Sequence, residues 1–156
     1  MTLSIAFRSA IYLSTTAIAA WIVGEPLIFP SLGPTAYVLA FNRYSGNLKE
    51  SAQTIVGGHF CGVLSGLLSY YLIVSPYQLS SVAYAFSTSG LMLSAGAVFA
   101  LFLTAFLMLS FKASHPPACA TTLIVSLGIL TSWQETIFIM IAVCMLYLVH
   151  KLYMQL

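Results

Sequence analysis

The sequence predicts an all-α fold, a polytopic helical bundle in a membrane. The chain of 156 residues is 60% hydrophobic and only 5% charged. Its mean hydropathy is +1.00, so it has too few polar side chains to cover a water-exposed surface. Its apolar segments also recur in the same order in the two halves of the chain. We therefore expect a single integral membrane domain over residues 1–156, made of two similar units.

Four apolar runs are long enough to cross a hydrocarbon core, which needs about 20 residues. The first resembles a signal peptide in having Arg8 ahead of an apolar stretch, but that stretch is longer than a signal core, so we expect a retained helix. The four runs are Leu3–Val23, Gln53–Ile73, Gly90–Phe111 and Thr136–Tyr153.

Two shorter segments are predicted to begin at prolines. Pro116 and Pro117 lack a backbone N–H and hold φ near the helical value, which suits the first turn of a helix running to about Gly128. The motif Ser31-Leu32-Gly33-Pro34-Thr35-Ala36 precedes a similar short apolar run, Tyr37–Phe41. In the simplest alternative, Ser31 and Ser114 are ordinary N-caps and the prolines only break helices.

The two motifs define an internal repeat. Ser31 and Ser114 are 83 positions apart, and at that offset Leu3–Val23 falls on Phe86–Phe106. Gln53–Val74 then falls near Thr136–Leu156. The predicted units are residues 1–75 and 84–156, each with a long, a short and a long segment.

The charges favour six crossings over four. If the short segments are re-entrant, the chain crosses four times and its basic residues show no bias. If each completes a crossing, all the basic residues face the cytoplasm and two acidic residues face out, as the positive-inside rule expects. Three crossings per unit make the second unit an inverted repeat. The basic residues are Arg8, Arg43, Lys49, Lys112 and Lys151, and the two acidic residues are Glu25 and Glu135.

In an inverted repeat, the helices starting near Pro34 and Pro117 would meet N-terminus to N-terminus at the midplane. Helix N-termini present unpaired N–H groups and partial positive charge, which suits a small anion. Protonated His115 would strengthen anion binding, so we expect acid pH to favour transport. The predicted substrate-binding residues are Ser31, Gly33, Pro34, Thr35, His59, Ser114, His115, Pro116 and Pro117.

A stripe of small residues predicts close helix packing. Gly58, Gly62 and Gly66 fall four positions apart in the second long run, which lets a neighbouring backbone approach. His59 beside the stripe is an ionisable residue in a membrane helix and hence a functional candidate; it could instead bond a carbonyl at the membrane interface.

Several function classes are not expected. The three cysteines lie in apolar runs and make no disulfide framework, and no spacing resembles a metal motif. We expect no metal, cofactor or nucleic acid. No Ser-His-Asp constellation or carboxylate pair is present, so we expect no enzyme; a membrane enzyme with His115 as base would lack a second catalytic group.

The stretch Ser114-His115-Pro116-Pro117-Ala118-Cys119-Ala120-Thr121-Thr122 resembles the signature of the HPP family of small integral membrane proteins. The motif Ser31–Ala36 and Gly57-Gly58-His59 match its two other recurrent stretches. The resemblance implies four membrane helices and, from some plastid and cyanobacterial members, nitrite transport. Many members carry a Gln-Pro-Arg-Asn-like stretch where this chain has Ser51-Ala52-Gln53-Thr54, so an anion-selecting arginine there is missing unless Lys49 or Arg43 replaces it.

We therefore expect a multi-pass protein of the cell (inner) membrane, a transporter or channel for a small, nitrite-like anion or another small polar solute. Its partners would be the lipid bilayer, the solute and a second copy of the chain, as a homodimer. The alternative is a non-transporting membrane subunit that builds a compact bundle for a partner.

Overall fold

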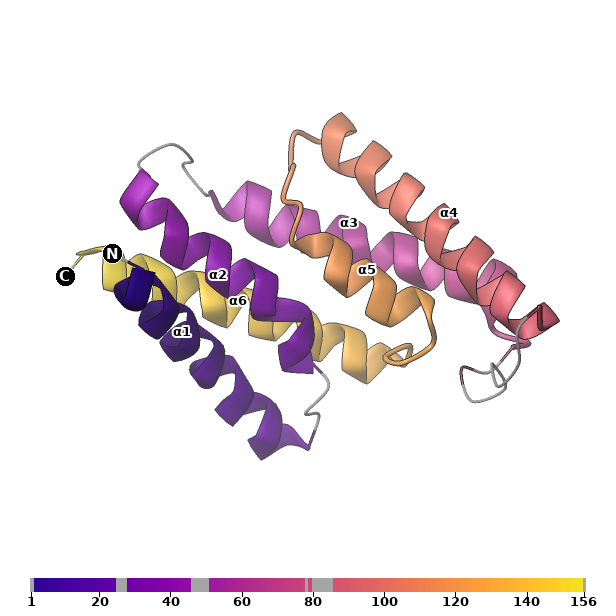
Figure 1. Cartoon of the computed structure of the whole chain (residues 1–156), viewed down its shortest axis with the longest axis horizontal. Coiled ribbons are helices and arrows are strands. Elements are labelled where there is room, and N and C mark those ends of the chain that lie inside the picture. The colour runs from indigo at the N-terminus through magenta and orange to yellow at the C-terminus, as the bar shows by residue number, and fades with distance from the viewer. Residues whose placement is uncertain (1, 25–27, 46–50, 78, 80–85, 156) are drawn as a thin grey trace.

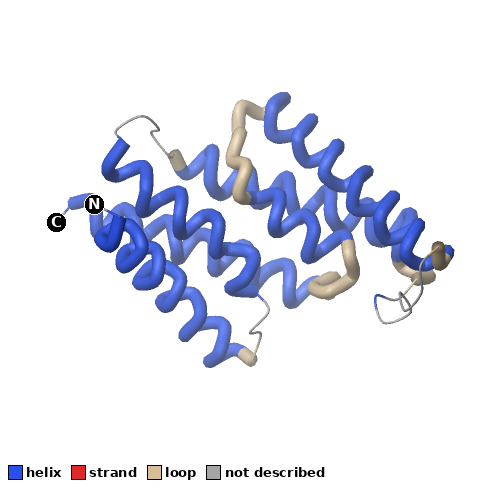
Figure 2. The backbone as a smooth tube through the Cα atoms, in the orientation of Figure 1, coloured by secondary structure: helices blue, strands red, loops and turns tan. Residues whose placement is uncertain are grey.

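The computed structural model describes residues 2–24, 28–45, 51–77, 79 and 86–155, which form a bundle of helices (Figures 1 and 2). A π-helical turn, η1 (Tyr70–Val74), continues the third helix. The all-α prediction is confirmed, and the described residues contain no strand. The helices are α1 (Thr2–Val23), α2 (Ile28–Ser45), α3 (Ala52–Ser69), α4 (Thr88–Ser110), α5 (Ala118–Ser126) and α6 (Trp133–Gln155).

The four predicted long runs are confirmed as helices that are long and apolar enough to span a membrane. Each predicted run overlaps one helix of the structure, with ends that differ by a few residues because the caps decide where a helix stops. Large apolar side chains such as Leu3, Phe102 and Leu152 are exposed on these helices, as expected for surfaces that face lipid. The four spans are Leu3–Ile22, Ala52–Val74, Thr88–Ser110 and Trp133–Met154.

Polar side chains fix the starts of two long helices. Ser51 and Thr54 form a capping box at the start of α3, in which each side chain bonds the backbone N–H of the other. At the start of α6, Glu135 Oε2 accepts from the backbone N–H of Ser132 at 2.7 Å. Its carboxylate thus satisfies the N-terminus of α6 and complements the positive end of that helix.

The prediction that a helix begins at Pro34 is wrong. The helix α2 already begins at Ile28, and Pro34 lies inside it. A proline inside a helix removes one backbone hydrogen bond, which membrane helices tolerate because their neighbours satisfy the freed group. Ser31 is therefore inside the helix as well, and the N-cap alternative for Ser31 is also wrong.

The prediction for Pro117 is confirmed. Pro117 is the N-cap of α5, with helical angles of φ −57° and ψ −24°. The helix ends at Ser126, and Gly128 follows at φ +83°, the left-handed conformation that commonly closes a helix. No side chain caps the start of α5, so Ser114 is not an N-cap.

Consecutive helices run in alternating directions along the bundle (Figure 1). The start of α1 therefore lies at the same end as the ends of α4 and α6, which places Arg8, Lys112 and Lys151 at one end and Glu135 at the other. Six crossings require this alternation, and the topology in a bilayer stays a prediction. Three other charged residues were used to predict six crossings. Glu25 and Lys49 lie outside the described residues, and so does the side chain of Arg43.

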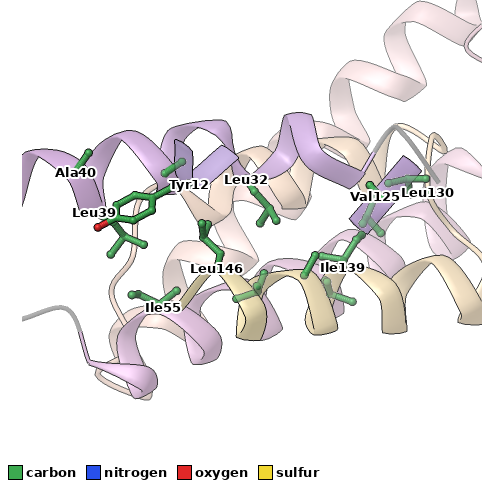
Figure 3. Close-up of a cluster of buried hydrophobic side chains, with 14 of the residues drawn as sticks. Tyr12, Leu32, Leu39, Ala40, Ile55, Val125, Leu130, Ile139 and Leu146 are labelled. Carbon is green, nitrogen blue, oxygen red and sulfur yellow. The ribbon is translucent and has the colours of Figure 1, made fainter. Parts of the chain in front are cut away.

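The main apolar core lies where α1, α2, α3 and α6 face one another, and it extends to α5 (Figure 3). Leu32 and Leu39 of α2 are fully buried there, together with Ile139 and Leu146 of α6. This packing holds α2 against α6, and Thr35 lies about one helical turn from both Leu32 and Leu39.

Candidate functional site

Four side chains form a hydrogen-bonded group inside the bundle. Thr35 Oγ1 of α2 lies 2.9 Å from His59 Nε2 of α3 and 3.2 Å from His115 Nε2. The other ring nitrogen, His59 Nδ1, lies 2.8 Å from Thr121 Oγ1 of α5. Each of the four residues has an exposed fraction of 0%. We call Thr35, His59, His115 and Thr121 the His-Thr cluster.

Glycine spacing on α3 brings His115 to this position. His115 lies in the segment between α4 and α5, which passes directly over Gly58. A Cβ built on Gly58 would lie 2.7 Å from His115 Cβ and 3.1 Å from the carbonyl oxygen of Ala113. Real Cβ atoms are not found so close to other atoms, so only glycine at position 58 allows this segment to carry the His115 ring next to His59.

The same stripe continues along the contact between α3 and α5. A Cβ on Gly62 would lie 2.9 Å from Ala118 O and from Thr122 Oγ1, and one on Gly66 would lie 2.7 Å from Val125 Cβ. The stripe therefore faces α5, and small residues let the two backbones approach. This close contact places Thr121 within reach of His59.

The His-Thr cluster has a defined hydrogen-bonding logic. The Thr35 hydroxyl carries one proton, so it can donate to only one of the two Nε2 atoms and must accept from the other. With both rings neutral, one histidine therefore carries its proton on Nε2 and the other carries it on Nδ1. Two such arrangements exist. They differ in which ring carries its proton on Nε2, and the other ring then carries its own on Nδ1.

The cluster can also accept one additional proton. A doubly protonated His59 donates from Nε2 to Thr35 and from Nδ1 to Thr121, and the Thr35 hydroxyl then donates to His115 Nε2. All the contacts stay satisfied. A second charge on His115 is opposed by repulsion, which is about 3 kcal/mol for two charges at the 5.4 Å separation of the ring centroids and an effective dielectric constant of about 20.

The first turn of α5 does not offer the unpaired N–H groups that the sequence predicts. Ala118 N donates to His115 O at 2.9 Å, Cys119 N to Pro116 O at 3.0 Å and Ala120 N to Pro117 O at 3.1 Å. These are tight bonds of the 3₁₀ type, and the two prolines have no N–H to add. The polar groups that α5 brings to this region are side chains.

The structure brings together only some of the predicted site residues. Thr35, His59 and His115 meet, whereas Pro34, Ser114 and Pro116 are exposed and Gly33 is half-buried with open space beside it. Ser31 and Pro117 are buried but are not part of the His-Thr cluster. Since both ring nitrogens of His59 bond threonine hydroxyls in the interior, the alternative of a carbonyl partner at the membrane interface is wrong.

Sequence reasoning did not select the threonines of α5 as site residues. Thr121 bonds His59, and Thr122 Oγ1 lies 2.9 Å from Thr104 Oγ1 of α4. The available signal was a pair of adjacent hydroxyl residues in the short helix that follows the two prolines. Among the described residues, no three of His, Cys, Asp and Glu are grouped so that they could hold a metal ion.

A family model for the transmembrane region of HPP proteins matches residues 2–156. The chain belongs to the HPP family. This membership and the four apolar spans identify an integral membrane protein. Searches of curated proteins and of solved structures give no match. The three stretches that carry the resemblance to HPP proteins each supply one member of the cluster, namely Thr35, His59 and His115, and the end of the third also supplies Thr121.

Proposed function

We propose that this HPP protein is a transporter of the cell membrane that moves a small monovalent anion such as nitrite, with the His-Thr cluster as its solute site. The observation that carries the proposal is the complete burial of two ionisable rings between α2, α3 and α5. An ionisable side chain inside a membrane protein is costly, and such residues typically mark solute or proton pathways. Apolar packing alone gives no reason to keep two of them in contact.

The chemistry of the cluster suits an anion better than a cation. Imidazole N–H and threonine O–H groups are donors, and one additional proton makes the cluster positive. Of the acidic residues, only Glu135 is among the described residues, and its carboxylate is engaged with the start of α6. A small anion at the cluster would therefore meet donors and no described carboxylate.

Zero exposure of the cluster corresponds to an occluded state. A solute reaches His59 only if helices separate, and α5 is the natural moving part because it is short and follows the non-helical segment that carries His115. Opening α5 away from α3 would break the contacts of Thr121 and His115 at the same time. This form of alternating access fits the proposed inverted repeat. The role is non-enzymatic, because the solute would leave chemically unchanged.

Uptake by proteoliposomes tests the proposal. Vesicles with purified protein are given nitrite, nitrate, formate or chloride, and uptake is compared with that of protein-free vesicles. We expect at least one anion to enter faster in the presence of the protein, and His59→Gln to abolish that increment. His150→Gln is the matched control, because His150 bonds Tyr12 at the contact of α1 and α6, outside the cluster.

Two results would count against the proposal, the first against transport itself and the second against the cluster as the solute site. No protein-dependent uptake of any of the four anions would favour the alternative of a non-transporting subunit. If His59→Gln folds normally and takes up the anion at the parent rate, the cluster is not part of the pathway.

Chemical cross-linking in the same vesicles tests the proposed homodimer.

A further inference from the structure

We propose that transport by this protein is coupled to protons: the His-Thr cluster takes up one proton with each monovalent anion, and the Thr35 hydroxyl relays that proton between the two histidines. This inference rests on the proposed function and adds the coupling ion and the stoichiometry. The observation that carries it is the position of Thr35 Oγ1 between two Nε2 atoms, at 2.9 and 3.2 Å.

The hydroxyl is placed to pass a proton without keeping it. When Nε2 of one ring carries the proton, it donates to Thr35 Oγ1, and the Thr35 O–H donates to the lone pair on Nε2 of the other ring. In the transfer, the first N–H bond breaks as a new O–H bond forms, and the original O–H proton moves to the second ring. One ring loses a proton, the other gains one, and the hydroxyl is unchanged. Both contacts are within hydrogen-bond distance.

Counting donors gives the stoichiometry. A single additional proton leaves every contact of the cluster satisfied, with Thr121 accepting from His59 Nδ1. A second would place two like charges in rings 5.4 Å apart. The proton comes from water on the side to which the cluster is open, and the ring nitrogen supplies the electron pair for the new N–H bond.

The groups around the cluster do not neutralise this charge. The cluster itself consists of Thr35 from α2, His59 from α3, His115 from the segment before α5, and Thr121 from α5. The helix α4 supplies Thr104, which bonds Thr122. None of these described groups is a carboxylate. The charge of one proton is therefore available to one bound anion, and the loaded cluster is neutral, which lowers the cost of moving it through a membrane.

The test compares two driving forces in the proteoliposomes, with nitrite as the probe. The first is a pH gradient of one unit, acid outside, without a membrane potential. The second is a potassium-valinomycin potential, positive inside, at equal pH. One proton per anion predicts accumulation of nitrite of about tenfold with the pH gradient, transient alkalinisation of the external medium during uptake, and no accumulation with the potential. Nitrous acid that leaks through lipid approaches the same ratio, so the contribution of the protein is the initial rate of uptake above that of protein-free vesicles.

Thr35→Val and Thr35→Ser separate a relay from a structural role. Thr35→Val removes the hydroxyl and should lower the initial rate of uptake driven by the pH gradient to that of protein-free vesicles, whereas Thr35→Ser should keep the parent rate. Should Thr35→Val fail to fold, His115→Gln replaces it, since a glutamine side chain does not take up the proton. A Thr35→Val protein whose uptake under the pH gradient stays well above that of protein-free vesicles would show that Thr35 only binds or positions, and would overturn the relay.

The outcomes for the parent distinguish this inference from the proposed function. Nitrite uptake driven by the potential and indifferent to the pH gradient would overturn proton coupling and leave transport standing. If the protein increases the uptake of none of the tested anions under either driving force, both proton coupling and the proposed transport function are overturned.

Discussion

Replacing Gly62 by alanine measures how strongly the cluster depends on the close contact between α3 and α5. The new Cβ would lie 2.9 Å from Ala118 O and 2.9 Å from Thr122 Oγ1. One of these atoms belongs to the backbone of α5, so the helices must move apart. Overpacking of this kind costs about 1–3 kcal/mol. Replacing a helical glycine by alanine also contributes about 1 kcal/mol of stability through helix propensity, which partly hides that cost.

Gly33→Ala supplies the matched control. Gly33 also lies inside a helix, but no atom lies within 4 Å of a Cβ built there. The Gly33→Ala variant should therefore gain the stability of about 1 kcal/mol that alanine contributes through helix propensity, without a clash. The free energy of unfolding is measured in mixed micelles by titration with sodium dodecyl sulfate and circular dichroism. We expect Gly62→Ala to be less stable than Gly33→Ala by about 1–3 kcal/mol, and Gly62→Leu to be less stable still. Equal stabilities of the two alanine variants would refute the packing argument.

Three further outcomes follow from the structure. In the variants Lys112→Cys and Lys151→Cys, the new cysteine should be labelled from one side of the membrane, and in Glu135→Cys it should be labelled from the other. Labelling of Lys112→Cys and Glu135→Cys from the same side would contradict six crossings. Acid pH should increase uptake by the parent, and His115→Gln should flatten this dependence with the fold preserved, because glutamine does not take up a proton; an unchanged profile would exclude His115 as its source. Thr104→Val should destabilise the protein by about 0.5–1.5 kcal/mol, the net contribution of one hydrogen bond, because Thr122 keeps its bond to the carbonyl oxygen of Ala118. Thr104→Ser should stay close to the parent in the same unfolding assay.

The sequence was sufficient for the features that depend on local physics. Length and hydropathy located the four long helices, and Pro117 located the start of α5 because a proline is favoured where an N–H has no partner. The same rule failed at Pro34, which lies inside α2. A membrane helix can continue through a proline, and nothing in the neighbouring residues indicates whether it does so.

The candidate site was only partly predictable, because it depends on which faces of distant helices meet. His59 and His115 were recognisable singly as ionisable residues in apolar surroundings. Their contact through Thr35 depends on the approach that Gly58 permits, and sequence spacing alone does not give that geometry. The prediction of free N–H donors at the start of α5 failed for a different reason: the first turn of α5 tightens, and its N–H groups bond carbonyl oxygens of the same segment.

Direct observation of the histidine rings tests the account's central claim, that the buried pair binds the transported anion. The chain contains three histidines, so ¹⁵N-histidine labelling gives three ring systems that single substitutions assign. Nitrite is titrated into the labelled protein in lipid nanodiscs at acid pH. We predict saturable shifts of the ring nitrogens of His59 and His115, with His150 unchanged. Signals of His59 and His115 that stay constant at nitrite concentrations that saturate uptake would contradict the account.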